Sequence, residues 1–142
     1  MSITFEIATP ERVVYKNTVD SLTLPTREGE ITVLPQHIPL VSMLAPGAIT
    51  VRKGNEEQYM AVSGGFIEVM PNNRVVVLAD TAERAEELTL EAVEKARADA
   101  VRTLEEKRGA DTESFTAAAA ALERELARLK VAHKHRPPHP KL

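Results

Sequence analysis

Residues 74–90 read RVVVLADTAERAEELTL, and the spacing of the apolar side chains changes within this stretch. Val75–Leu78 form a short run rich in β-branched side chains, and the segments before it repeat with a period of two, as strands do. From Leu90 onward the apolar residues follow helical spacing. Residues 80–87 are polar and contain neither glycine nor proline, which predicts a structured elbow between two lobes.

Strand patterns separated by turn signals fill the first lobe. Ile3, Phe5 and Ile7 alternate with polar residues, and the turn at residues 25–29 gives a hairpin with a charged tip. The paired glycines in Ser63-Gly64-Gly65 predict a bulge or a corner where the chain crosses between sheets. We count about nine or ten short strands, with turn signals roughly every eight to twelve residues, which is typical of a β-sandwich or a flattened barrel.

Two helices are predicted in the second lobe. Thr89 is the expected N-cap of a helix that runs to Lys107, and Gly109 is placed to end it. Asp111 or Thr112 starts a second helix, and the short connection predicts an antiparallel hairpin. The seam of this hairpin is mostly alanine, so little apolar area is buried and we expect a weak tertiary clasp.

The fold class is therefore α+β, an N-terminal β-sandwich followed by a C-terminal antiparallel two-helix hairpin. The predicted boundaries are 1–84 for the sandwich, 85–134 for the hairpin and 135–142 for a disordered basic tail.

Composition narrows the possible functions. The chain has 142 residues, no cysteine and a formal net charge of -3. The slight acidity argues against nucleic acid as a partner. No stretch approaches the roughly twenty apolar residues that span a bilayer, so we expect any membrane association to be through other proteins. The absence of cysteine excludes a thiolate nucleophile and a Cys-ligated metal, and we predict no metal site.

No enzyme motif is recognisable in the sequence, and we predict that the chain is not an enzyme. Ser63-Gly64-Gly65 lacks the G-x-S-x-G nucleophile elbow, and there is no phosphate-binding glycine loop. His37 is the only histidine in the expected folded body and is interpreted as a surface loop residue. Arg124 and Arg128 stand one helical turn apart with like charge. Either Glu125 offsets them, or they form a docking face for an acidic partner or a phosphate.

Three stretches carry a family resemblance. They read GEITVLPQHIPL at 29–40, VSGGFIEV at 62–69 and LADTAERA at 78–85. In this order and at these distances they closely resemble the epsilon subunit of the rotary, F-type proton-translocating ATP synthase. The resemblance covers about residues 1–134, which is nearly the whole chain.

The resemblance implies a non-catalytic subunit of the central stalk that couples the proton-driven c-subunit ring to the gamma shaft and to the alpha/beta catalytic head. It implies that the helical hairpin either folds against the sandwich or extends toward the beta subunits, where it restrains ATP hydrolysis. The implied location is the cytoplasmic face of the bacterial cell membrane, peripheral through the complex, with no cofactor. On this basis Arg27 and Glu28, with His37 nearby, face the rotor ring, and Arg124 and Arg128 meet acidic residues of a beta subunit.

Some members of this family bind ATP through an (I/L)-D-x-x-R-A motif and later arginines. Thr89 and Ala92 replace its acidic and arginine positions here, although Glu83, Arg124 and Arg128 remain. We therefore predict weak or absent ATP binding. The alternatives are a nucleotide-sensing module that acts outside the synthase, which needs the missing pair, and an enzyme with a site on the sandwich.

Overall fold

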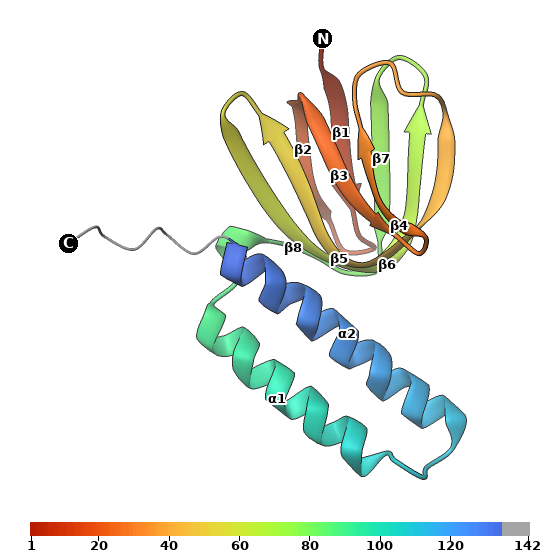
Figure 1. Ribbon diagram of the computed structural model, residues 1–142, viewed down its shortest axis with the longest axis vertical. Coiled ribbons are helices and arrows are strands. Elements are labelled where there is room, and N and C mark those ends of the chain that lie inside the picture. The colour runs from red at the N-terminus through yellow and green to blue at the C-terminus, as the bar shows by residue number, and fades with distance from the viewer. Residues whose placement is uncertain (135–142) are drawn as a thin grey trace, which may run out of the picture.

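A β lobe and a pair of long helices make up the described part of the chain (Figure 1). The computed structural model describes residues 1–134, and the basic tail predicted at 135–142 lies outside the described residues. The strands are β1 (Ile3–Ala8), β2 (Val13–Val19), β3 (Ser21–Thr26), β4 (Gly29–Val33), β5 (Leu40–Lys53), β6 (Glu56–Met70), β7 (Arg74–Ala79) and β8 (Ala82–Arg84). A 3-10 turn, η1 (Ala85–Glu87), precedes the helices α1 (Leu90–Glu106) and α2 (Thr112–Lys134).

The long strands β5 and β6 bend around the end of the β lobe that faces the helices (Figure 1). They span 14 and 15 residues and pair with each other through almost their whole length. The second half of β6 pairs with β7, whereas its first half pairs with β8. The sequence pattern predicts two short strands in place of β5 and two in place of β6. The predicted number is therefore about ten, whereas the described residues contain eight strands.

The strands form one continuous sheet, which folds on itself and encloses the core. Their order is β2-β1-β7-β6-β5-β3-β4, and β1 and β7 run parallel while their other neighbours are antiparallel. Phe5, Ile7, Leu22, Ile67 and Val77 are completely buried inside it. Within the described chain, the main core cluster draws only on residues 3–82, so no helical side chain contributes to it.

The corner in β6 depends on glycine. Gly65 has a φ of +135°, and a Cβ at this position would collide with the carbonyl oxygen of Leu78 on the neighbouring strand. Gly64 also has a positive φ of +94°. The predicted corner at Ser63-Gly64-Gly65 is confirmed, and it lets β6 turn from one part of the ladder to the other.

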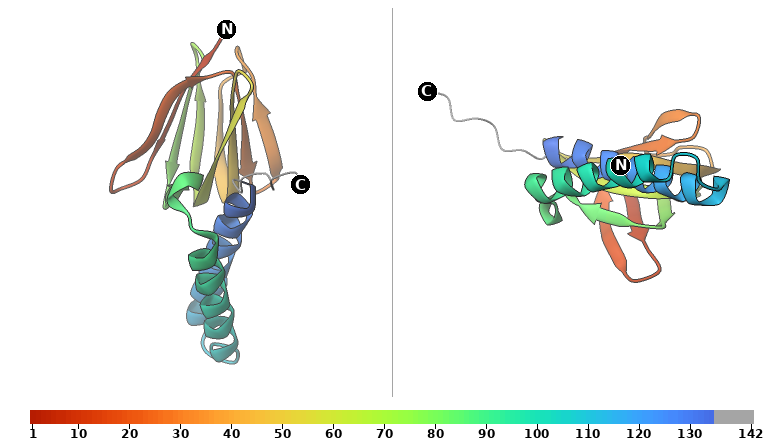
Figure 2. Two further views of the ribbon diagram at one scale, coloured as in Figure 1. Left: turned by 90° about the vertical axis from the view of Figure 1, so that its left-hand side faces the viewer. Right: turned by 90° about the horizontal axis from the view of Figure 1, so that it is seen from below.

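The helical hairpin is confirmed, with small differences at its ends. Thr89 occupies the N-cap of α1, but its side chain makes no capping hydrogen bond. α1 ends at Glu106 with Lys107 as its C-cap, one residue earlier than predicted. Gly109 has the expected left-handed conformation, with a φ of +85°, but lies in the connection two residues after that cap. Asp111 caps α2, because its carboxylate accepts hydrogen bonds from the Ser114 amide at 3.0 Å and hydroxyl at 2.8 Å. Figure 2 shows α2 next to the β lobe and the hairpin projecting away from it.

Candidate docking surfaces

An exposed apolar face covers the outer side of β5, β6 and β7. Met43 pairs with Phe66 and Phe66 pairs with Leu78, so the three side chains form one row across the strands. They are 47%, 56% and 57% exposed, and Val41, two residues before Met43, is 71% exposed. An aligned row of apolar side chains in water is typical of a protein interface. We call these four residues the apolar face.

Sequence reasoning did not single out the apolar face, although a signal for it was present. Residues 75–78 are apolar at every position instead of alternating. In this run Val75 and Val77 point into the core, while Leu78 is exposed. A strand that is apolar on both faces indicates that both faces are covered in the assembled state.

The structure separates residues that the sequence placed together. Arg27 and Glu28 form the turn between β3 and β4, whereas His37 lies in the loop after β4. β4 has five residues between these two points, or roughly 16 Å at 3.3 Å per residue. Figure 1 accordingly shows the β3–β4 turn at the end of the lobe next to the helices and the β4–β5 loop at the opposite end. The expectation that His37 lies near Arg27 and Glu28 is wrong.

The His37 loop is held against the turn between β6 and β7. The Gln36 amide donates to Asn73 Oδ1 at 2.5 Å, and the His37 amide donates to the Leu34 carbonyl at 3.2 Å. His37 Nδ1 is 2.7 Å from the carbonyl oxygen of Ile38. Leu34 and Ile38, on either side of His37, are 58% and 75% exposed. The loop therefore presents apolar side chains at its end of the β lobe.

The helices dock through α2 onto a bed of small side chains. Ala48 of β5 pairs with Ala61 of β6, and both are buried in a small cluster with Val131 of α2. This cluster is separate from the main core. Small side chains let the helix approach the sheet closely but bury little area, and each buried methylene contributes only about 0.8 kcal/mol. We call this docking of α2 on the β lobe the clasp; it is a different contact from the seam between the two helices.

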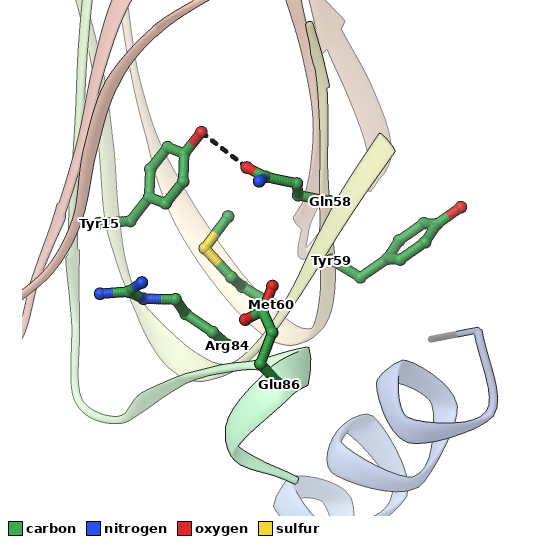
Figure 3. Close-up of a pocket in the computed structure, with 6 residues that line it drawn as sticks. All are labelled: Tyr15, Gln58, Tyr59, Met60, Arg84 and Glu86. Carbon is green, nitrogen blue, oxygen red and sulfur yellow. Dashed lines mark hydrogen bonds between the residues drawn. The ribbon is translucent and has the colours of Figure 1, made fainter. Parts of the chain in front are cut away.

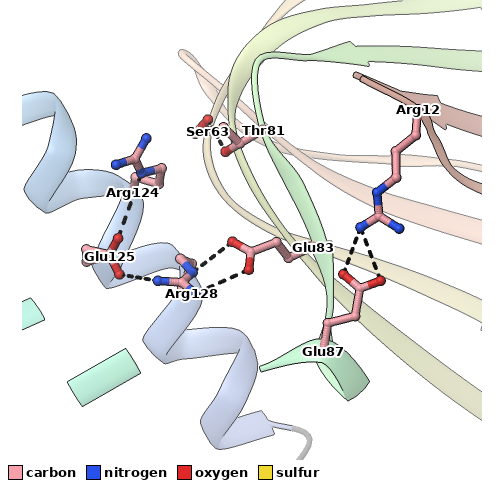
Figure 4. Close-up of polar contacts among 8 residues, drawn as sticks. All are labelled: Arg12, Ser63, Thr81, Glu83, Glu87, Arg124, Glu125 and Arg128. Atoms are coloured by element: carbon pink, nitrogen blue, oxygen red, sulfur yellow. Dashed lines mark hydrogen bonds and ion pairs between the residues drawn. The ribbon is translucent and has the colours of Figure 1, made fainter. Parts of the chain in front are cut away.

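A network of charges reinforces the clasp (Figure 4). Arg128 Nε of α2 lies 2.8 Å from Glu83 Oε1 of β8, as an ion pair whose angle is too bent for a hydrogen bond, and Arg128 Nη2 donates to Glu83 at 3.2 Å. Arg128 Nη1 donates to Glu125 Oε2 at 2.6 Å. Burial disfavours the charged guanidinium, but the hydrogen bond to Glu125 and the charge of Glu83 outweigh it, so the pKa of Arg128 is raised.

Glu125 offsets the like charges of Arg124 and Arg128. It is only 7% exposed, and it contacts Arg128 at 2.6 Å and Arg124 Nε at 3.8 Å. Glu83, Arg124 and Arg128 line one open cleft of about 210 Å³, so the structure brings these three sequence candidates together. In this arrangement Arg128 forms ion pairs with two carboxylates of its own chain, Glu83 and Glu125. The side chain of Arg124 is 45% exposed.

The elbow between the lobes is ordered and tied to the β lobe. Arg84 Nε donates to the carbonyl oxygen of Val14 at 2.9 Å, and β8 pairs with β6. Arg12 Nη2 contacts both carboxylate oxygens of Glu87, at 3.0 and 3.2 Å (Figure 4). The predicted structured elbow at 80–87 is thus confirmed, and the clamped segment extends as far as Glu87.

A small cavity lies beside the elbow (Figure 3). Tyr15, Gln58 and Arg84 line it, and the Tyr15 hydroxyl donates to Gln58 Oε1 at 2.9 Å. Burial raises the pKa of Tyr15. The volume is about 40 Å³, which is room for roughly one or two water molecules and not for a metabolite.

The described part of the chain shows neither a metal-binding cluster nor a membrane-spanning helix. Residues 1–134 contain no group of three or more His, Cys, Asp or Glu side chains arranged to hold a metal ion. Neither α1 nor α2 is apolar enough along its length to cross a bilayer.

Comparisons with known proteins agree on one family. The family model "ATP synthase, Delta/Epsilon chain, beta-sandwich domain" matches residues 2–85. The chain is 44% identical to the ATP synthase epsilon chain of Chloroflexus aggregans over 136 residues, which is 96% of each chain. It is 45% identical to the ATP synthase epsilon chain of Moorella thermoacetica over 133 residues, covering 92% of this chain and 96% of that one.

Solved structures give the same result. A chain in the Euglena gracilis mitochondrial ATP synthase, a structure of OSCP, F1 and the c-ring, matches with a TM-score of 0.77 and 27% identity over 93% of this chain and 81% of that chain. A chain in the Tetrahymena thermophila mitochondrial ATP synthase central stalk and c-ring matches with a TM-score of 0.57. At 17% identity, over 94% of this chain and 96% of that chain, the second match shows the fold alone.

Proposed function

Because this chain belongs to the ATP synthase delta/epsilon family and matches epsilon chains over nearly its whole length, we propose that it is a non-catalytic subunit of the central stalk. It couples the c-subunit ring to the gamma shaft and the alpha/beta head during ATP synthesis. The proposed location is the cytoplasmic face of the bacterial membrane, where the subunit is peripheral and held by the complex.

The apolar face is the observation that supports this function best. Met43, Phe66 and Leu78 form an exposed row on a rigid sheet. A rotor subunit must transmit torque, which needs a stiff surface that is fixed to the shaft by desolvated apolar contacts. We assign the apolar face to the gamma subunit. The apolar loop around His37 extends the same kind of surface toward the far end of the lobe.

The other end of the lobe is suited to the rotor ring. The β3–β4 turn carries Arg27 and Glu28, whereas the loop at the opposite end exposes Leu34 and Ile38. The c ring can contact only one of these two ends. If the loops of the ring are polar, the charged β3–β4 turn suits them better than the apolar loop around His37. Arg27 and Glu28 are therefore the proposed rotor contacts, and His37 goes with the shaft side.

The hairpin is the proposed regulatory element. It is held by an alanine bed and a charge network and contributes nothing to the main core within the described chain, so it can leave the β lobe without unfolding it. In the extended posture Arg128 loses Glu83, which belongs to the β lobe, while Glu125 moves with α2. Arg124 and Arg128 then meet acidic residues of a beta subunit, and ATP hydrolysis is restrained. Residues 1–84 would then serve as the rotor anchor and 85–134 as the regulatory part.

A nucleotide-sensing module outside the synthase is the second candidate. It is favoured only by the cleft that gathers Glu83, Arg124 and Arg128. Arg128 is already neutralised by two carboxylates there, and Thr89 and Ala92 stand at the family's acidic and arginine positions. Titration calorimetry of ATP into the purified chain tests this candidate. Micromolar affinity would support it, and no heat at millimolar ATP would remove it.

Binding to the catalytic head with its shaft, prepared without this subunit, tests the stalk function. Phe66→Glu should weaken binding by about 100-fold or more, because it buries a charge at the centre of the interface. Phe115→Glu is the matched control, since Phe115 is also an exposed phenylalanine, at 41%, but lies on α2. Equal binding by wild-type chain and Phe66→Glu would exclude the apolar face as the shaft contact.

A further inference from the structure

The apolar face does not end at the edge of the β lobe, because it continues into a cleft whose opposite wall is α2. The cleft has a volume of about 590 Å³. Met43 and Phe66 line it on the sheet side, and Ala120 and Glu123 line it on the helix side. The floor is the bend of β5 from Leu44 to Pro46.

A second opening extends this cleft along the helix. It has a volume of about 300 Å³ and shares Pro46 and Glu123 with the first. Leu126 and Lys130 line it from α2. Ala120, Glu123, Leu126 and Lys130 are three or four residues apart, so they lie on one side of the helix. Leu126 is 47% exposed although it stands beside an apolar floor. We call the two openings together the α2 groove.

We propose that the α2 groove is occupied by the gamma subunit that covers the apolar face, through an amphipathic helix that contacts both lobes. This inference rests on the proposed function. Continuity supports it, because Met43 and Phe66 belong to both surfaces. Charge supports it too. The groove has an apolar floor between side chains of both signs, Lys130 against Asp80 and Glu123, which suits a helix with one apolar stripe and mixed charges beside it.

Such a contact links shaft binding to the posture of the hairpin. One wall of the groove is built from the sheet and the other from α2, so the groove exists only while α2 is docked. A ligand that binds both walls stabilises the docked state by its differential affinity, and the coupling is reciprocal. The gamma subunit then stabilises the docked hairpin. For α2 to leave the β lobe, it must break its contact with the gamma subunit as well as its contacts with the sheet.

Point variants along α2 test the proposal. The measurement is the dissociation constant for the catalytic head with its shaft, prepared without this subunit. Leu126→Glu should weaken binding by about tenfold, and Ala120→Glu should act in the same direction from the first opening. Phe115→Glu, on the same helix but outside the groove, should change binding less than about twofold.

Hydrogen exchange gives an independent readout. On binding of wild-type chain, amides of the β5 bend and of residues 120–130 should become protected together. Exchange of the free variants must match the free wild type, which shows that α2 is still docked in them. Unchanged affinity for both Leu126→Glu and Ala120→Glu, or protection of the bend without α2, would overturn the proposal. If the wild-type chain does not bind the head with its shaft, the proposed function itself fails. If the wild-type chain binds and only the groove variants keep its affinity, the proposed function stands and the groove proposal fails.

Discussion

Arg128 on α2 and Glu83 on β8 form an ion pair at 2.8 Å that joins the last helix to the last strand. The pair is partly shielded, with side-chain exposures of 22% and 31%, and it is the contact that links the charge network of α2 to the β lobe. The strength of the hairpin clasp can therefore be measured by changing either partner.

Glu83→Gln should loosen the docked hairpin by about 0.5 to 1 kcal/mol, because a partly exposed pair contributes little. Arg128→Met should cost more, roughly 2 to 3 kcal/mol, since it leaves the buried Glu125 with only a distant partner. Hydrogen exchange of the α2 amides measures both effects. Arg102→Gln is the control, because Arg102 pairs with Asp99 on exposed α1 and should change nothing. Equal effects of Glu83→Gln and Arg128→Met would contradict this ranking.

The cap of α2 should depend on acid. Hydrogen bonds from the Ser114 amide and hydroxyl lower the pKa of Asp111 below 3.8. A carboxylate with a lowered folded pKa adds stability above its unfolded pKa, and this stability is lost as the pH falls through the folded pKa. Following the Ser114 amide by NMR from pH 5 to pH 2 should therefore give a midpoint below 3.8. Asp111→Asn should abolish the titration, and a midpoint at or above the ordinary value would disprove the cap.

Gly65→Ala should damage the β lobe severely. The added Cβ meets backbone rather than a flexible side chain, and the φ of +135° is unfavourable for alanine. We expect a loss of about 3 kcal/mol or more in the free energy of unfolding, measured with urea. Gly54→Ala is the matched control, because Gly54 also has a positive φ, of +62°, but has open space around it. This control should lower the free energy of unfolding by only about 1 kcal/mol.

Cross-linking decides which end of the β lobe faces the rotor ring. The chain contains no cysteine, so single cysteines can be introduced without background. Glu28→Cys should cross-link to the c ring in the assembled synthase, and His37→Cys should not, because the two positions lie at opposite ends of β4. The reverse pattern would move the ring contact to the loop around His37.

Removing residues 88–142 should leave a folded β lobe. The truncated chain keeps the main core and the Arg12–Glu87 clamp, so its sheet should melt cooperatively in circular dichroism. In the assembled enzyme the truncation should raise the rate of ATP hydrolysis, because the restraining hairpin is absent. A truncated chain that is unfolded at 25 °C would refute the division into two lobes.

Local patterns were sufficient for much of the fold. The alternation of Ile3, Phe5 and Ile7 and the helical spacing after Leu90 predict the elements that are observed. The glycines at 64–65 predict the corner. The sequence does not reveal that β5 and β6 run unbroken through their bends, because Pro46 and Gly47 are also ordinary strand breakers.

The candidate site was harder to predict, because its parts meet only in three dimensions. Glu83 and Arg128 are 45 residues apart in the chain and touch through the docking of α2. The separation of His37 from the charged turn is hidden in the sequence, because the two lie only about nine residues apart. The extended strand β4 between them places them at opposite ends of the β lobe. Exposed Phe66 and buried Ile67 are neighbours of the same chemical type, so composition alone does not distinguish an interface from a core.

The parallel pairing of β1 with β7 has a consequence for biosynthesis. β1 can pair with β2 early, but its other edge stays unpaired until residues 74–78 have been made. Such distant pairing makes folding slow, on the order of milliseconds to seconds. Translation at about 5 to 20 residues per second still leaves several seconds before the last residues of the chain are added. The sheet can close while the helices are still being synthesised, so the β lobe can be complete before the proposed regulatory hairpin exists.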